Sequence, residues 1–469
     1  MGAVAGDASG LDLSKLVTIV GAGFSKHASP SMPVLTELGD ALVARLRGHP
    51  AVDRLTTSER ALVDSDRVPL GDLEAWLTSL ATAQPYNTRP EQLRRRALFL
   101  DVAAIAGEIV AERERESLRA PVPHWLARLV TLWHYRRSTV LTFNYDTLIE
   151  ATAETLSLID AEVSAQNRLG GVTTRNLTRG FPPSLPGPGM EFAPVDVETL
   201  ELVKLHGSLN WWGRSSANDL FSIVAGGAAS SWETDAAHKC PMRGLSQVIV
   251  PPIADKSGQY GNSTIETLWL TAAQAIREAS TIMLFGYSLP PSDTTATALL
   301  SENAPAQTPI LVVDPCQQSI VERMREWLPN DIEGLGCENL DNHTIQVDRL
   351  LEGFERAAVS GPIPWHEGDA GGQLNPNCFV HIHTANGLKL DCSGLDADTH
   401  VLLAGGQAVS SGSVRPSGKA VDPNDLARCR FVRTEDGQQL PVYRFDRHQN
   451  TTEHSVVRVR AGPLAPVAS

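Results

Sequence analysis

The sequence predicts an α/β protein with a Rossmann-like, doubly wound parallel sheet, a helical insertion and a small C-terminal β-rich domain. Patterns of buried strands alternate with helix patterns from residue 14 to about residue 330, which is typical of a parallel sheet covered by helices on both faces. The first apolar run, 16–20, leads directly into Gly21-Ala22-Gly23, a turn that brings backbone close to a ligand. Short β-like runs replace this alternation after residue 361.

At 469 residues the chain is long for one domain. We expect a flexible N-terminus over 1–13, a main domain over 14–360 with a helical insertion at about 51–135, and a β-rich accessory domain over 377–460. The net charge of −14 argues against a general nucleic-acid or anionic-membrane surface. No apolar run approaches the length of a membrane span and no signal peptide is evident, so we expect a cytoplasmic protein. The six cysteines form no closely spaced pairs, so we expect reduced thiols and no metal site.

The first helix pattern after the glycine loop runs from about Met32 to Arg47, with Leu and Val recurring on one face. Asp72 and Glu74 are predicted to open a helix near residue 73. Residues 91–116 predict a longer helix, because their apolar side chains recur at helical spacing. A shorter helix follows Pro123.

Four further strands are predicted at 138–143, 202–205, 281–285 and 310–313, and each ends in a polar segment. The segments are Asn144-Tyr145-Asp146, His206-Gly207, Gly286-Tyr287-Ser288 and Asp314-Pro315. Ligands of such sheets bind outside the carboxyl ends of the strands, so these segments are expected to line one crevice.

Three other stretches complete the main region. The run 248–250 is interpreted as another strand end. Residues 163–200 are rich in Gly, Pro, Thr and Asn and predict a long loop, and residues 210–240 look irregular.

Four short motifs, in this order along the chain, resemble those of the sirtuin superfamily. They are Gly21-Ala22-Gly23-x-Ser25, Thr142-Phe143-Asn144-Tyr145-Asp146, Lys204-Leu205-His206-Gly207 and Gly286-Tyr287-Ser288-Leu289. The resemblance covers about residues 14–330 and is closest to the bacterial sirtuin-like NAD hydrolases of phage defence. The segment from His206 to Trp211 is its most specific match. It implies an enzyme that cleaves the nicotinamide–ribose bond of NAD⁺ to give nicotinamide and ADP-ribose.

The resemblance also implies roles for individual residues. Asn144 would contact the nicotinamide ribose and position the attacking water, and His206 would be the base near the ribose hydroxyls. Asp146 would hold the carboxamide of nicotinamide. The phosphates and riboses would be bound by Gly21, Ala22, Gly23, Ser25, Gly286, Ser288 and Asp314. This chemistry suits the residue types, because positive charge builds on the ribose while a neutral group leaves, so water must be positioned but no strong acid is needed.

The chain departs from the pattern of the protein-deacylating sirtuins. These carry a four-cysteine zinc module after the His-Gly segment, where this chain has only Cys240. Hydrolysis of NAD by water is therefore the leading hypothesis, with NAD as substrate and no metal expected. An NAD-dependent protein deacylase and a non-catalytic NAD or ADP-ribose sensor are the alternatives. We also expect a homo-oligomer, activity gated by a partner protein or trigger ligand, and the β-rich domain as the candidate gate.

Overall fold

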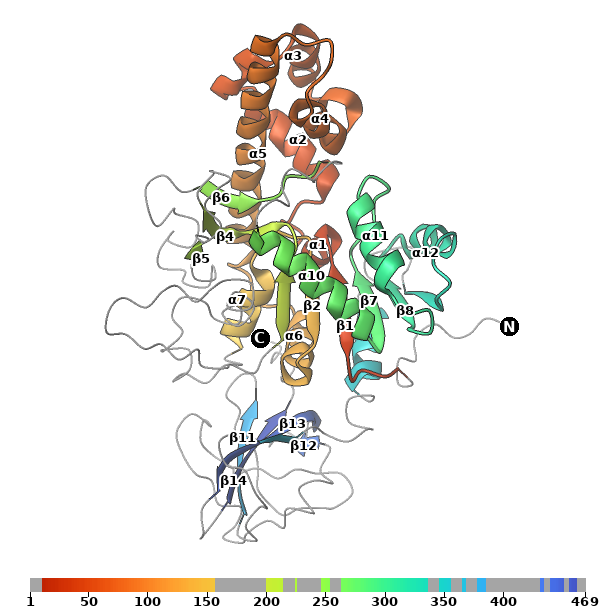
Figure 1. Ribbon diagram of the computed structural model, residues 1–469. Helices are drawn as coiled ribbons and strands as arrows, with labels where there is room; N and C mark the ends of the chain where they lie inside the picture. Colours follow the sequence, from red (N-terminus) through yellow and green to blue (C-terminus); the bar gives the residue numbers. More distant parts are fainter. Residues whose placement is uncertain are drawn as a thin grey trace.

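The computed structural model describes residues 11–156, 200–213, 224–225, 246–253, 263–335, 346–355, 365–367, 378–384, 431–433, 439–450 and 455–461. At its centre lies a six-stranded sheet in the order β3-β2-β1-β7-β8-β9, with every neighbouring pair parallel (Figure 1). The strands are β1 (Leu16–Val20), β2 (Thr139–Thr142), β3 (Glu201–Lys204), β7 (Thr281–Phe285), β8 (Ile310–Val313) and β9 (Ile332–Leu335). The predicted Rossmann-like sheet is confirmed.

The strand order reverses direction between β1 and β7. From β1 the chain builds outward through β2 to β3, and it then returns to the other side of β1 to add β7, β8 and β9. β1 and β7 pair in register from Leu16 with Thr281 to Val20 with Phe285, so their carboxyl ends lie side by side. In doubly wound folds a reversal of this kind opens a crevice where ligands bind.

Helices cover both faces of this sheet. One face packs on α6 (His124–Arg136), α7 (Leu148–Thr155) and the helical residues 346–355, and the other on α10 (Ser263–Glu278), α11 (Thr294–Asn303) and α12 (Gln317–Arg325). Side chains of β1 alternate between the two cores, Leu16 and Val20 entering the first and Val17 and Ile19 the second. Because both faces are buried, these strands are almost continuously apolar, as the sequence pattern indicated.

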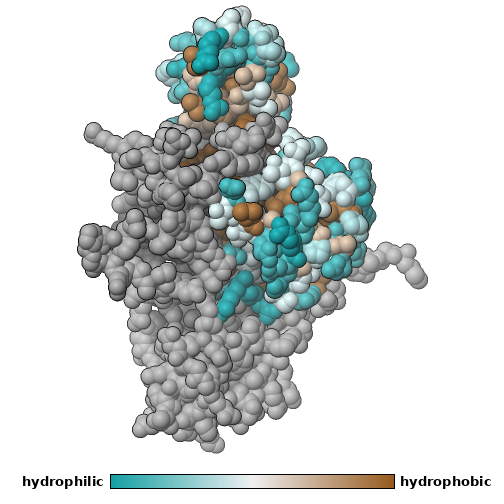
Figure 2. All heavy atoms as spheres, in the orientation of Figure 1, coloured by the Kyte–Doolittle hydropathy of each residue, from teal (hydrophilic) through white to brown (hydrophobic). Residues whose placement is uncertain are grey.

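A helical unit stands beyond the carboxyl ends of the strands (Figure 1). It contains α2 (Leu35–Leu46), α3 (Thr57–Asp64), α4 (Leu73–Ala81) and α5 (Arg89–Ser117), with 3₁₀ turns at Pro50–Arg54 and Pro69–Gly71, around a third core. α5 confirms the helix predicted at 91–116, and its periodic apolar side chains are buried. In Figure 2 polar and apolar side chains alternate over the visible surface of this unit. No helix within the described ranges has the length and hydropathy needed to cross a bilayer.

The helix that follows the glycine loop is α1 (Ala22–Ala28), not the helix predicted at Met32–Arg47. α1 is seven residues long and mixes polar with apolar side chains, so it lacks the periodicity that reveals a helix. The predicted stripe belongs to α2, which packs on α4 and α5 in the helical unit. The flexible segment predicted over 1–13 is also too long, because Leu13 is buried and the Asp12 carbonyl accepts hydrogen bonds from Ser280 and Thr281.

A three-stranded antiparallel sheet follows β3. It consists of β4 (Gly207–Gly213), β5 (Val224–Ala225) and β6 (Ser246–Ile249), with β4 in the middle. The chain reverses at Gly207, whose φ of +81° suits glycine. One expectation was therefore wrong, because 210–213 belong to β4 and 224–225 to β5, although 210–240 were predicted to be irregular. The strand end predicted near 248 is confirmed as β6, which pairs with β4 outside the parallel sheet. Most of the loop predicted at 163–200 lies outside the described residues.

The C-terminal part forms a five-stranded sheet. Its order is β10-β13-β14-β11 with β12 paired to β13, from β10 (Trp365–Glu367), β11 (Cys378–Thr384), β12 (Phe431–Arg433), β13 (Gln439–Asn450) and β14 (Ser455–Ala461). The predicted β-rich region is confirmed, although β10 precedes the expected start at residue 377. The runs predicted at 388–390 and 400–403 lie outside the described residues. β13 contacts α6, which connects this sheet to the main unit.

Candidate active site

Glycines pack the end of β1 directly against the end of β7. The Gly23 amide donates to the Gly286 carbonyl at 2.8 Å, and the Gly21 amide donates to the Phe285 carbonyl at 3.3 Å. Gly286 has a φ of +60°, and a Cβ added there would lie 2.0 Å from the Phe24 nitrogen. Side chains at these positions would push the two strand ends apart. Gly21, Gly23 and Gly286 thus form a close-packed glycine floor at the switch point, the place between β1 and β7 where the strand order reverses. The Gly23 N–H already has a hydrogen-bond acceptor within the protein.

Three of the predicted site residues form one hydrogen-bonded group beside this floor. The Asn144 side-chain amide donates to the Ser25 hydroxyl at 2.9 Å and to the Gly21 carbonyl at 2.8 Å. The Ser25 hydroxyl in turn donates to Asp146 Oδ2 at 2.7 Å. Ser25 and Asp146 are buried and Asn144 is half-buried. The end of β2 is thereby tied to the first turn of α1.

These contacts orient the Asn144 side chain. Both N–H groups of its amide are directed at protein oxygens, so Oδ1 is the atom left to accept a hydrogen bond from a ligand or water. The Asn144 backbone N–H donates to Thr142 Oγ1 at 3.0 Å, which holds the main chain as well. A half-buried acceptor fixed in this way is suited to orienting a hydroxyl group or a water molecule.

Asp146 titrates at unusually high pH for an aspartate. Burial, followed by repulsion from Glu114, raises its pKa from 3.8 to about 6. Lys204, the Ser25 hydroxyl and the Leu148 amide oppose this rise by favouring the ionised carboxylate. Asp146 is therefore ionised at neutral pH, but it gains a proton under mildly acidic conditions.

Buried charges that sequence reasoning missed support the loop that carries Asp146. Lys204 Nζ donates to the Asp146 carbonyl at 2.6 Å and forms an ion pair of 3.0 Å with Glu150. Glu114 of α5 accepts hydrogen bonds from the Thr147 hydroxyl, at 2.9 Å, and from the Thr147 amide. Lys204 lies inside one of the four motifs of the resemblance, so it could have been selected from the sequence as a residue that supports the site. Glu114 lies in the alternating charged run 112–116, which resembles a solvent-exposed face and offers no such signal.

His206 lies at the turn between β3 and β4 and is buried. Its ring contacts Phe143 edge to face, with centroids 4.9 Å apart, and also lies near Trp269. Phe143 stacks on Tyr287 at 4.4 Å, and the Tyr287 hydroxyl donates to Asp293 Oδ2 at 2.9 Å. An aromatic row therefore connects His206 with the loop after β7. Sequence reasoning assigned no role to Phe143 or Tyr287.

The other predicted site residues are more dispersed. Ala22 and Ser288 are exposed, and the Ser288 carbonyl accepts a hydrogen bond from Arg323. Asp314 follows β8, is half-buried, and accepts the Cys316 amide at 2.7 Å. Burial raises the pKa of Asp314. The structure joins Ser25, Asn144 and Asp146 by direct contacts, and places Ser288 and Asp314 at neighbouring strand ends outside that group.

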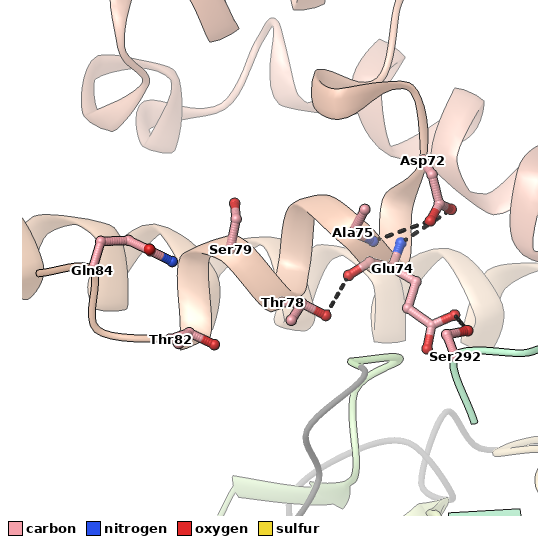
Figure 3. Close-up of a pocket in the computed structure, with 8 residues that line it drawn as sticks. All are labelled: Asp72, Glu74, Ala75, Thr78, Ser79, Thr82, Gln84 and Ser292. Carbon is pink, nitrogen blue, oxygen red and sulfur yellow. Dashed lines mark hydrogen bonds between the residues drawn. The ribbon is translucent and has the colours of Figure 1, made fainter. Parts of the chain in front are cut away.

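A pocket of about 460 Å³ lies between α4 and the loop after β7 (Figure 3). Asp72 caps α4 through the amides of Glu74 and Ala75, as expected for a residue that opens a helix. Glu74 accepts a hydrogen bond of 2.7 Å from the Ser292 hydroxyl. Both acidic residues line this pocket.

The described part of the chain contains histidine, aspartate and glutamate side chains, which are residue types that bind metal ions. No set of three or more His, Cys, Asp and Glu side chains there is placed to hold a metal ion. Cys316 is a free, exposed thiol, and Cys240 lies outside the described residues.

No family model and no curated protein matches this sequence. Among solved structures, a Sir2 homologue in complex with NAD is similar, with 14% identity and a TM-score of 0.37 over 75% of this chain and 92% of that one. A structure titled for the mechanism and regulation of Sir2 enzymes has 12% identity and a TM-score of 0.32 over 75% and 94%. A Sir2 homologue mutant in complex with 2'-O-acetyl ADP ribose has 14% identity and a TM-score of 0.33 over 74% and 95%.

Proposed function

We propose that this chain is an NAD⁺ hydrolase that cleaves the nicotinamide–ribose bond. The observation that carries the proposal is the Asn144–Ser25–Asp146 group beside the glycine floor at the switch point. The crevice of a doubly wound fold suits a dinucleotide, and the group beside it offers a fixed acceptor in Asn144 Oδ1. The motif order along the chain supports NAD as the dinucleotide.

In the proposed reaction, water attacks C1' of the nicotinamide ribose. The C1'–N bond breaks, its electron pair goes to the pyridine nitrogen, and nicotinamide leaves as a neutral molecule. Asn144 Oδ1 accepts a hydrogen bond from the water or from a ribose hydroxyl, and the imidazole of His206 accepts the proton that is released. The ionised Asp146 holds the Ser25 hydroxyl, and through it the Asn144 amide, in the productive orientation.

One incubation separates this proposal from its alternatives. Purified protein is mixed with NAD⁺, with and without an acetyl-lysine peptide, and nicotinamide and ADP-ribose are followed by chromatography. Release of both products without peptide supports the hydrolase. Nicotinamide release that requires the peptide, with an acetylated ADP-ribose as co-product, supports the deacylase. Binding of NAD⁺ without turnover supports the sensor.

We further propose that the enzyme depletes NAD in the bacterial cytoplasm during phage defence and that its C-terminal sheet controls assembly. An unregulated NAD hydrolase would harm its own cell, and the motifs of the proposed site all precede residue 330. The test compares the full chain with a variant that ends at Gly361, using light scattering, circular dichroism and NAD-induced thermal shift. A folded variant with unchanged assembly and activity would remove this role. A folded variant that no longer binds NAD would place the sheet in the pocket.

A further inference from the structure

The loop that follows β7, residues 286–293, connects the glycine floor to α11. Its first residue is held in place, because the Gly286 amide donates to the carbonyl of the last residue of β8 at 2.9 Å. Its last residue, Asp293, caps the N-terminus of α11. The shape of the loop beside the crevice therefore depends on what holds its middle, at Ser288 and Leu289.

The middle of the loop has a strained backbone. Leu289 has a φ of +48°, in the left-handed region that residues with a Cβ rarely adopt. Its side chain is buried in the core between the sheet and α10, α11 and α12. Burial fixes where this side chain lies, but the cost of the backbone angle remains. Such a conformation persists only where surrounding contacts stabilise it.

Arg323 of α12 supplies that contact. Its Nη2 donates to the Ser288 carbonyl and, at 3.1 Å, to the Leu289 carbonyl. Extended backbone points successive carbonyl groups to opposite sides, so one nitrogen reaches both only while the chain turns at Leu289. Among the described residues no other side chain donates to either carbonyl, and no carboxylate there forms an ion pair with Arg323.

The helix that carries Arg323 is anchored on the central sheet. The buried side chains of α12 are Ile320, Val321 and Met324, and the helix contacts both β8 and β9 (Figure 1). Arg323 is half-buried on the same helix. The position of its guanidinium group is therefore set by the packing of α12, and the loop is held relative to the strand ends.

Ser288 is the exposed residue of this held segment. Tyr287, just before it, stacks on Phe143 at 4.4 Å, and Leu289, just after it, is buried. Within the part of the chain that the structure describes, neither the hydroxyl nor the backbone N–H of Ser288 has a hydrogen-bond acceptor. Both donors are thus available to a ligand, and phosphate and ribose oxygens accept such hydrogen bonds.

We propose that Arg323 is a positioning residue for NAD⁺, because it holds Ser288 and Leu289 in the conformation that leaves both Ser288 donors available to the dinucleotide. The inference rests on the proposed function and adds to it a residue outside all four sequence motifs. Arg323 contacts carbonyl oxygens of the loop and none of the reacting atoms. Its loss should therefore weaken binding of NAD⁺ more than it slows cleavage of the nicotinamide–ribose bond.

The test compares Arg323→Met with Arg325→Met in the full chain. Arg325 is the matched control, because it lies on α12 and donates to another backbone carbonyl, that of Ile332 in β9, at 2.6 Å. ADP-ribose is the probe for calorimetric titration, since it has the phosphates and riboses of NAD⁺ but no nicotinamide bond to cleave. Arg323→Met is expected to weaken ADP-ribose binding by about 10-fold, and Arg325→Met should leave it unchanged.

Two further measurements separate positioning from other roles. The KM for NAD⁺ should rise by about 10-fold in Arg323→Met while kcat changes by less than about 3-fold. The loss of affinity should persist in about 1 M sodium chloride, because a local hydrogen bond is not screened as long-range attraction is. Arg323→Lys keeps one nitrogen that can donate to both carbonyls and should recover part of the loss. Melting temperatures establish that all variants are folded.

Several outcomes would overturn the inference. They are equal ADP-ribose binding by the wild-type chain and Arg323→Met, an equal loss in Arg325→Met, a difference that disappears at high salt, and no recovery in Arg323→Lys. A wild-type chain that neither binds ADP-ribose nor hydrolyses NAD⁺ would overturn the proposed function itself, and this inference with it.

Discussion

The amide of Asn144 and the carboxylate of Asp146 share one hydrogen-bond partner, the hydroxyl of Ser25, at 2.9 and 2.7 Å. A hydroxyl has a single hydrogen, so Ser25 can accept from Asn144 and donate to Asp146 only while Asp146 Oδ2 carries no proton. The orientation of Asn144 is therefore linked to the ionisation of a residue two positions away in the chain.

Asn144→Ala and His206→Ala are each expected to reduce NAD hydrolysis by about 10²–10⁴-fold, because a positioning acceptor or a base is lost. Product formation measured by chromatography checks this, with melting temperature as the test of folding. Asn303→Ala is the control, since Asn303 is half-buried and bonds the Leu299 carbonyl of its own helix at 2.8 Å. Near-normal turnover in either site variant would contradict the proposed mechanism.

NAD hydrolysis is expected to rise with pH through about 6, the pKa of Asp146, because the ionised carboxylate holds Ser25 in the accepting orientation. Ser25→Ala removes the hydroxyl through which Asp146 acts on Asn144, so the rate should be lower and this inflection should be lost. Initial rates across the acidic and neutral range measure both profiles. An unchanged inflection in Ser25→Ala would show that the observed titration does not act through Asp146 and Ser25.

Asp146→Asn is expected to be more stable than the wild-type chain at neutral and higher pH. The folded-state pKa, about 6, exceeds 3.8, the ordinary pKa of an aspartate in an unfolded chain, so the folded protein favours the protonated acid. Ionised Asp146 then costs about 3 kcal/mol above the folded pKa, and this cost vanishes as pH falls toward the unfolded value. Urea unfolding at several pH values gives the difference. A pH-independent difference for Asp146→Asn would contradict the assignment.

Lys204→Met is expected to destabilise the fold by about 3–5 kcal/mol, because it leaves Glu150 buried without its cation. Lys15→Met breaks an exposed pair with Glu278, which solvent and salt screen, and should change stability far less. Denaturant midpoints compare the two variants. Adding Glu150→Leu to Lys204→Met should restore part of the loss, whereas a double variant no more stable than the single one would show that the Lys204 bonds to backbone carbonyls dominate.

Gly286→Ala is expected to destabilise the protein by about 2–5 kcal/mol, because the added Cβ overlaps the Phe24 backbone at a positive φ. Gly48→Ala has open space around its Cβ and should change stability by less than about 1 kcal/mol. Thermal unfolding and NAD-induced thermal shift measure both. A stable Gly286→Ala variant that binds NAD normally would show that the strand ends tolerate separation.

Local patterns in the chain predicted the parallel sheet, the long helix α5 and the positions of Asn144, His206 and Gly286 at strand ends. These features follow from periodicity and from turn chemistry, both of which act over a few neighbouring residues. α1 was not predicted, because a helix of seven residues with mixed polarity has no periodic apolar face. The run near 248 was predicted as a strand, but only the structure shows that it pairs with β4, because an apolar run indicates a strand without specifying its partner.

What the sequence by itself determined is which residue types stand at the ends of the strands, and in what order. Only the tertiary structure decided which of them touch. Ser25 meets Asp146 across 121 positions, and Glu114 is buried because one side of α5 faces the loop at Thr147. The physical reason is that strand pairing and helix packing select one partner among many chemically similar residues, and the burial that results sets the charge state of Asp146.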